Sequence, residues 1–230
     1  ENPPATEPPP PVTSVAILSA PDAATRLDAA RAFLEPHAAE HELLLVGETR
    51  EAADDLAYEI AGRLGATFGL HRFSVRQLAA RIAAVDLARA GSAPATPLGV
   101  EAVATRAAFE EIERDTLDYL RPIARLRTFG RTLAATLHDL RHAEVPVAHV
   151  SRLESVGRDL GVLAACYAQQ LDQARLVDAP MLYRLAAAVA ARGVARPPLG
   201  VPTVLLDVAV ADDATLALIA VGALVRTTGS

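Results

Sequence analysis

Short apolar runs alternate with amphipathic segments near the start of the chain. Residues 15–18 and 43–46 are apolar runs too short for helices, and each is followed by a turn signal, which predicts two buried strands. A predicted helix over 23–34 lies between them, and Thr49 is placed to cap a second helix that runs to about Leu64. Alternating strands and helices of this length predict a parallel sheet with right-handed crossovers.

A long helical stretch follows, and a third apolar run comes after it. The predicted helices cover 77–90, 98–112, a segment through Phe129 and Leu140, a segment through Leu160 and Leu171, and a last helix capped by Asp178. Residues 196–200 break the helical pattern, and residues 204–207 then repeat the apolar pattern of the first two runs. We therefore predict an α/β fold in which the runs at 15–18, 43–46 and 204–207 lie side by side in one parallel sheet.

Shifts in composition and periodicity divide the chain into four segments. Proline occupies six of the positions from 3 to 11, so residues 1–13 are expected to form a disordered tail or a linker. The predicted order is then a first α/β part over 14–76, a helical insertion over 77–196 and a return to the α/β domain over 197–230.

The residue types that are missing exclude several kinds of chemistry. All 22 basic residues are Arg, so the chain has no lysine for nucleotide phosphates, for a Schiff base or for a general base. A single cysteine, Cys166, excludes an internal disulfide and a four-thiolate zinc site, and it suits a reducing, cytoplasmic setting. We expect no cofactor.

Charge and hydropathy limit the partners. A formal net charge of −6 argues against a whole surface that attracts nucleic acid, although local Arg clusters remain able to do so. No uncharged run reaches the ~20 residues of a membrane span, so we expect a soluble protein with no membrane contact.

Three groups of residues have a spacing that metal sites also use. They are His37 with Glu40 and His41, His138 with His142, and Asp207 with Asp212 and Asp213. The first group lies in a predicted helix-to-strand connection, the second on a predicted solvated helix face, and the third where aspartates commonly cap helices or line loops. We therefore expect no metal.

Three short stretches together resemble superfamily 1 helicases of the UvrD and RecB kind. Residues 43–56 match an apolar strand followed by T-x-x-A-A-x-x-[LM], the family's motif Ia, with Thr49 at its start. Residues 71–78 resemble the T-F-H-S-F-x-x-R-x-L stretch before the family's helical 1B subdomain, with Gly69 and Leu70 in place of the leading Thr and Phe. Residues 204–208 lie where motif II would return the chain to subdomain 1A. The resemblance implies a P-loop-type parallel sheet with a 1B-like helical insertion.

Two departures from the family imply a domain that does not hydrolyse ATP. Ala24 stands where the phosphate-binding Lys of G-x-x-x-x-G-K-[ST] would be, and only the final Thr25 is kept. The Asp-Glu pair that would hold Mg²⁺ and activate water is Asp207-Val208. Such inactivated regions are found in AddB-type subunits of bacterial recombinational DNA-repair helicase-nucleases. The resemblance thus implies a fragment of a longer protein, which could carry a PD-(D/E)xK nuclease domain elsewhere.

The same resemblance implies single-stranded or forked DNA and an active, AddA-like helicase-nuclease subunit as partners. Two sets of residues are candidates for DNA: Thr49 and Arg50, and then His71, Arg72, Phe73 and Arg76. Thr49 could equally be a plain helix cap, and Phe73 could pack in the core. Arg72 and Arg76 would share a helix face if the helix begins by Arg72. The alternative function is an interaction module in which the helical segment at 77–192 docks a partner protein and does not contact DNA.

Overall fold

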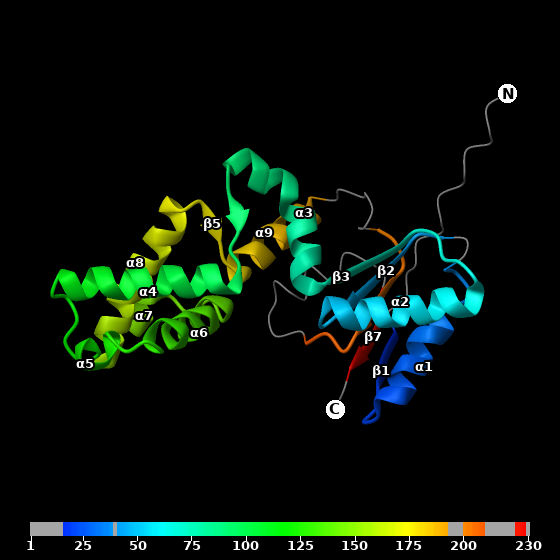
Figure 1. Ribbon diagram of the computed structural model, residues 1–230, viewed down its shortest axis with the longest axis horizontal. Coiled ribbons are helices and arrows are strands. Elements are labelled where there is room, and N and C mark those ends of the chain that lie inside the picture. The colour runs from blue at the N-terminus through cyan, green and yellow to red at the C-terminus, as the bar shows by residue number, and fades with distance from the viewer. Residues whose placement is uncertain (1–15, 39–40, 193–199, 210–223, 229–230) are drawn as a thin grey trace. The chain divides into compact units, whose positions relative to one another are not determined.

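The computed structural model describes residues 16–38, 41–192, 200–209 and 224–228. The chain divides into two compact units (Figure 1). We call residues 1–78 with 187–230 the α/β unit, and residues 79–186 the helical unit. The proline-rich segment over 1–13 lies outside the described residues.

The α/β unit is built on a parallel sheet. Its strands are β1 (Ala16–Ser19), β2 (Leu43–Gly47), β3 (Leu70–Ser74), β6 (Thr203–Leu206) and β7 (Leu224–Thr228). The strand order is β1-β7-β6-β2-β3, and every neighbouring pair is parallel. The three strands predicted from the sequence share this sheet, each within about one residue of its expected bounds. They are not all neighbours, however, because β7 lies between β1 and β6.

Two helices cover one face of this sheet. They are α1 (Ala23–Leu34) and α2 (Arg50–Leu64), which match the two helices predicted between and after the first strands. Leu34 and Ile60, one from each helix, pack with Leu45 of β2 and Val204 of β6 in one apolar core. Gly47 permits the tight passage from β2 into α2, because a Cβ at this position would lie 2.6 Å from the carbonyl oxygen of Thr49.

The helical unit consists of helices and one short strand pair. Its elements are α3 (Val75–Ala90), whose first turn belongs to the α/β unit, β4 (Ala93–Pro94), α4 (Pro97–Glu113), α5 (Arg121–Ala124), α6 (Phe129–His142), α7 (Val147–Val150), α8 (Val156–Gln173), β5 (Leu176–Val177) and α9 (Ala179–Ala191), whose last residues belong to the α/β unit. The five long helices match those predicted from the apolar periodicity. Leu137, Leu163 and Tyr167 are almost completely buried where α4, α6 and α8 meet.

A short strand pair joins distant parts of the helical unit. β4 and β5 are parallel, with Ala93 opposite Leu176 and Pro94 opposite Val177. The sequence does not predict this pair, since two residues, one of them a proline, are too few for a strand pattern. The pair holds together the chain before α4 and the chain after α8.

None of the helices in the described parts of the chain combines the length and the apolar character needed to cross a membrane.

Candidate functional site

The residues predicted for the degenerate nucleotide site lie at the carboxyl edge of the sheet. Ala24 and Thr25 are in the first turn of α1, which follows β1, and Asp207 directly follows β6. Open parallel sheets bind their ligands at this edge. The side chains that occupy it therefore decide whether a nucleotide can enter.

A carboxylate of the chain itself closes the amino terminus of α1. Asp22 is the N-cap of the helix, and its Oδ1 accepts a hydrogen bond from the backbone N–H of Thr25 at 2.7 Å. This hydrogen bond is the main reason why the pKa of Asp22 lies below its ordinary value. Free N–H groups and the helix dipole are what draw phosphate to a helix amino terminus. Here one N–H is already bonded, and an incoming phosphate would meet a negative charge.

An arginine is paired with the carboxylate that follows β6. Nε of Arg26 lies 2.7 Å from Oδ1 of Asp207, and Nη2 lies 3.2 Å from Oδ2. The third donor, Nη1, is hydrogen-bonded to the carbonyl oxygen of Ala20 at 2.7 Å. The pKa of Arg26 is raised, chiefly by its hydrogen bond to Asp207. Both oxygens of Asp207 therefore face a guanidinium group.

The backbone at Asp207 supports this arrangement. Asp207 has φ of +53°, a left-handed conformation that Asp tolerates better than most residues. Val208, the next residue, is 2% exposed and adds only apolar surface. The carboxylate of Asp207 is thus paired with Arg26.

Sequence reasoning missed Arg26 and Asp22. Arg26 follows Thr25 in the first turn of α1, but its partner is 181 positions further along the chain, and no local pattern joins the two. Asp22 had a visible signal, since Asp three residues before Thr25 at the start of a helical pattern is a common N-cap.

The residues predicted to contact DNA at α2 form a second cluster. Thr49 is the N-cap of α2, and its Oγ1 accepts a hydrogen bond from the N–H of Ala52 at 3.2 Å, so the helix-cap interpretation is confirmed. Nε of Arg50 lies 2.9 Å from Oδ2 of Asp54, and Nη1 donates to the carbonyl oxygen of Arg72 at 2.6 Å. Arg50 therefore links the start of α2 to β3.

Arg72 shares this carboxylate and lies over an aromatic ring. Its Nη1 is 3.4 Å from Oδ1 of Asp54, and its guanidinium carbon lies 5.6 Å from the centre of the Tyr58 ring. Two arginines thus share one aspartate, which leaves a local excess of one positive charge. Tyr58 was not predicted, although the sequence shows an aromatic residue nine positions after the Thr49 cap.

A pocket of about 250 Å³ opens beside Arg72, between α2 and β3. Its lining residues are Ala57, Tyr58, Ala61, Thr67, Gly69, Leu70 and Arg72. Tyr58 is 67% exposed, and Phe68, which lies in the chain between two lining residues, is 74% exposed. Exposed aromatic rings next to a guanidinium group are typical of sites that stack planar ligands.

The remaining predicted DNA residues do not all join this cluster. The expectation that Arg72 and Arg76 share a helix face is wrong, because Arg72 lies in β3 and α3 begins only at Val75. His71 and Phe73 alternate with Arg72 along β3, so they lie on the opposite face of the sheet. Nε2 of His71 is 3.9 Å from Oε2 of Glu42, and Phe73 is half-buried.

In each of the two histidine pairs the rings lie close together. The rings of His138 and His142 are stacked with centroids 5.5 Å apart, and those of His37 and His41 meet edge-on at 5.8 Å. Within the described residues no three His, Cys, Asp or Glu side chains are grouped so as to hold a metal ion. Glu40, Asp212 and Asp213 lie outside those residues.

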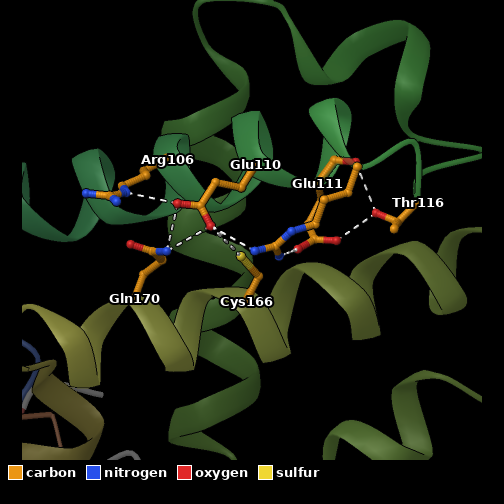
Figure 2. A network of polar contacts seen from close by, with 7 residues as sticks. Arg106, Glu110, Glu111, Thr116, Cys166 and Gln170 are labelled. Carbon is orange, nitrogen blue, oxygen red and sulfur yellow. Dashed lines mark hydrogen bonds and ion pairs between the residues drawn. The ribbon is translucent and has the colours of Figure 1, made fainter.

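The helical unit contains a polar network between α4 and α8 (Figure 2). The carboxylate of Glu110 accepts hydrogen bonds from Nε2 of Gln170 at 2.8 Å and from Nε of Arg106 at 3.0 Å, and Sγ of Cys166 lies 3.8 Å away. Glu111 is almost fully buried and accepts a hydrogen bond from Oγ1 of Thr116 at 2.7 Å. Burial raises the pKa of Glu111, but hydrogen bonds, from Thr116 first, outweigh it and leave the pKa below its ordinary value. Glu111 is thus held in its charged form, and both carboxylates are hydrogen-bonded, which suits a structural role.

Cys166 is expected to react very slowly with thiol reagents. Burial, together with the neighbouring carboxylates, raises the pKa of its thiol to about 11. At pH 8 this lowers the thiolate fraction roughly a hundredfold relative to an ordinary thiol. Reaction with 5,5′-dithiobis(2-nitrobenzoate) should therefore be at least about a hundredfold slower in the native protein than in urea. A native rate within tenfold of the unfolded rate would contradict this prediction.

A scan against models of protein families found no match to this chain, and a search of curated proteins found none.

Proposed function

We propose that this chain is a non-catalytic, helicase-like domain of a bacterial recombinational DNA-repair helicase-nuclease. In this proposal it binds single-stranded DNA, or holds an active partner subunit, without hydrolysing ATP. The observation that carries the proposal is the Arg26–Asp207 ion pair at the carboxyl edge of the sheet. It supports a P-loop-type origin in which the nucleotide position has been filled by the protein's own side chains.

The physical argument concerns charge. A nucleotide needs cationic groups for its phosphates and a carboxylate for Mg²⁺. Here the carboxylate of Asp207 is neutralised by Arg26, the N–H of Thr25 is bonded to Asp22, and the chain contains no lysine. Mg²⁺ would have to displace the bidentate contact between Arg26 and Asp207, and the phosphates would have to displace the Asp22 side chain that caps α1.

We expect no binding of Mg²⁺-ATP to the full chain by isothermal titration calorimetry, and no ATP hydrolysis above background. The Arg26→Ala variant should not gain binding, because freeing Asp207 does not restore a lysine. Thr25→Ala serves as the matched control for any residual turnover. Micromolar affinity, or a turnover that Thr25→Ala removes, would refute the proposal.

The cluster at α2 and β3 supports single-stranded DNA as the ligand of the α/β unit. Arg72 supplies a positive charge beside the pocket, and Tyr58 and Phe68 offer exposed rings for base stacking. Arg50 acts mainly as a positioning residue, since its guanidinium is bonded to Asp54 and to the backbone of β3. The acidic net charge keeps the expected affinity low.

We expect a fluorescein-labelled 15-nucleotide oligo(dT) to bind with an affinity that falls as salt rises. Arg50→Ala with Arg72→Ala should lower the slope of log affinity against log salt by roughly 0.7 per lost phosphate contact. Tyr58→Ala should weaken binding by about 1 to 3 kcal/mol for each base that stacks on the ring. Arg63→Ala is the control, because Arg63 belongs to the same helix and pairs with Glu59 and Glu35. Unchanged affinity and slope in the double variant, with circular dichroism unchanged, would remove this site.

A second candidate function is the docking of a partner protein by the helical unit. It is favoured by large apolar side chains that the unit leaves exposed around α5, including Phe109, Ile123 and Leu126. In this alternative the α/β unit is a scaffold, and recognition belongs to the helices.

A further inference from the structure

The surface around α5 is apolar and hollowed. Leu126, which follows α5, is 58% exposed and lines two adjoining pockets of about 390 and 280 Å³. Phe109 and Ile112 of α4 line the larger pocket, and Ile123 and Val156 line the smaller one. A group of exposed apolar side chains around a depression commonly marks a site of interaction with a partner.

The same surface is basic within an acidic protein. Residues 119–138 contain four arginines and no acidic residue, although the chain as a whole carries a net charge of −6. Arg121 pairs with Asp115, and Nε of Arg131 lies 3.8 Å from Oε2 of Glu101. In the part of the chain that the structure describes, the exposed side chains of Arg125 and Arg127 form no ion pair, and both line the larger pocket. Among the described residues that line the two pockets, Glu113 is the one acidic residue, so the balance of their charges is positive.

We propose that this α5 surface, made of Phe109, Ile123, Arg125, Leu126 and Arg127, binds an acidic amphipathic helix of a partner protein. The apolar side chains of that helix fill the two pockets on either side of Leu126, and its carboxylates pair with Arg125 and Arg127. The proposal rests on the second candidate function, the docking of a partner by the helical unit, and it specifies the surface and the chemistry of the partner.

The composition of the surface selects this occupant over others. Helices and their connections line both pockets, so no strand edge offers backbone groups to an extended peptide, whereas a helix needs only side-chain contacts. A second copy docked face to face would bring Arg125 and Arg127 against their own counterparts. A nucleic acid would pair with the arginines but would leave the apolar pockets unfilled.

Two labelled probe peptides test the proposal on the full chain by fluorescence anisotropy at low salt. Both are 16-residue helices with leucines at i, i+4, i+7 and i+11, and they differ only in carrying Glu or Lys at the flanking positions. The acidic peptide is expected to bind at least tenfold more tightly than the basic one. Leu126→Glu should lower the affinity for the acidic peptide at least tenfold. Arg125→Glu with Arg127→Glu should make the basic peptide bind more tightly than the acidic one.

Matched controls separate this surface from general effects. Leu98→Glu places the same charge at a leucine that is 75% exposed in α4 and lines neither pocket. Arg89→Glu with Arg152→Glu changes the net charge by the same amount as the arginine pair. Neither control should alter binding, and circular dichroism should be the same for all variants.

Several results would overturn the proposal. They are equal binding of the two peptides, no binding of either, or equal losses in Leu98→Glu and Leu126→Glu. Self-association in analytical ultracentrifugation that Leu126→Glu abolishes would assign the surface to a second copy, and oligo(dT) competing with the acidic peptide would assign it to nucleic acid. A loss of peptide binding in Leu98→Glu alone would support docking by the helical unit, but at another face than the α5 surface. The ATP titration reports on the α/β unit alone, so its result does not decide the docking proposal, and the peptide experiment does not decide the ATP prediction.

Discussion

Replacing Arg141 with Ala is expected to lower the free energy of unfolding by about 4 kcal/mol. Nε of Arg141 lies 2.6 Å from Oδ2 of Asp178 and Nη2 lies 3.3 Å from Oδ1, and the side chain of Asp178 is only 3% exposed. Removing one partner of a buried pair leaves an uncompensated charge, which typically costs 3–5 kcal/mol. Asp178 also caps α9 through the N–H of Met181, so the damage extends to that helix.

Urea unfolding followed by circular dichroism measures this effect. Arg131→Ala is the control in the same helix, since Arg131 is 80% exposed and 3.8 Å from its acidic partner, and a loss below about 0.5 kcal/mol is expected. Adding Asp178→Asn to Arg141→Ala should recover part of the loss, because it removes the unpaired charge. A loss below about 1 kcal/mol for Arg141→Ala, or no recovery in the double variant, would contradict the argument.

Asp159→Ala is expected to cost about 3 kcal/mol and to loosen the segment before α5. Asp159 is fully buried in the first turn of α8, and its carboxylate accepts hydrogen bonds from the backbone N–H groups of Asp118 at 3.2 Å and of Leu120 at 2.8 Å. Alanine leaves both donors without an acceptor, and each unsatisfied buried group typically costs 1–3 kcal/mol. Leu120 directly precedes α5, so the geometry of the α5 surface depends on this anchor.

Hydrogen exchange adds a local measurement to the urea midpoint. The amide protons of Asp118 and Leu120 should lose their protection in Asp159→Ala more than those in the middle of α4. Asp118→Ala is the matched control, because the side chain of Asp118 is exposed and pairs with the exposed Arg158. Uniform changes in protection across the helical unit would indicate a general loss of stability and would refute the anchoring role.

The elements that the sequence predicts well are those with one continuous signal. β2 and β6 are buried along their whole length, so their apolar runs identify them, and the long helices follow their 3.6-residue periodicity. β3 was missed because its sequence, Leu-His-Arg-Phe-Ser, places charged residues in a strand at the end of the sheet. Because β3 ends at Ser74 and α3 begins at Val75, the condition under which Arg72 and Arg76 would share a helix face is not met.

In the candidate site too, local features were predicted from the sequence and contacts between distant segments were not. Thr49 was identified because a helix cap is a local feature, with its donor three residues away. The pairing of Arg26 with Asp207 and the contact of Arg72 with Tyr58 depend on which strands and helices become neighbours, and sequence periodicity carries no information about that. Asp207 was placed by its position at the end of the third apolar run, but the cation beside it was not foreseen.

The β4–β5 pair affects the order in which the protein folds. β6 and β7 must enter the sheet between β1 and β2, so Thr203 has to find Leu44 across the whole helical unit. Once Ala93 is paired with Leu176, the free chain between β3 and β6 is roughly threefold shorter, which lowers the entropy cost of closing that loop by about 1 kcal/mol. Contacts within the helical unit are local and form quickly, whereas the sheet depends on distant segments. We therefore expect the helices to assemble first and the β4–β5 pair to speed completion of the sheet. Substitutions at residues 93–94 or 176–177 that break this pair should then slow refolding of the five-stranded sheet, although those residues are not part of it.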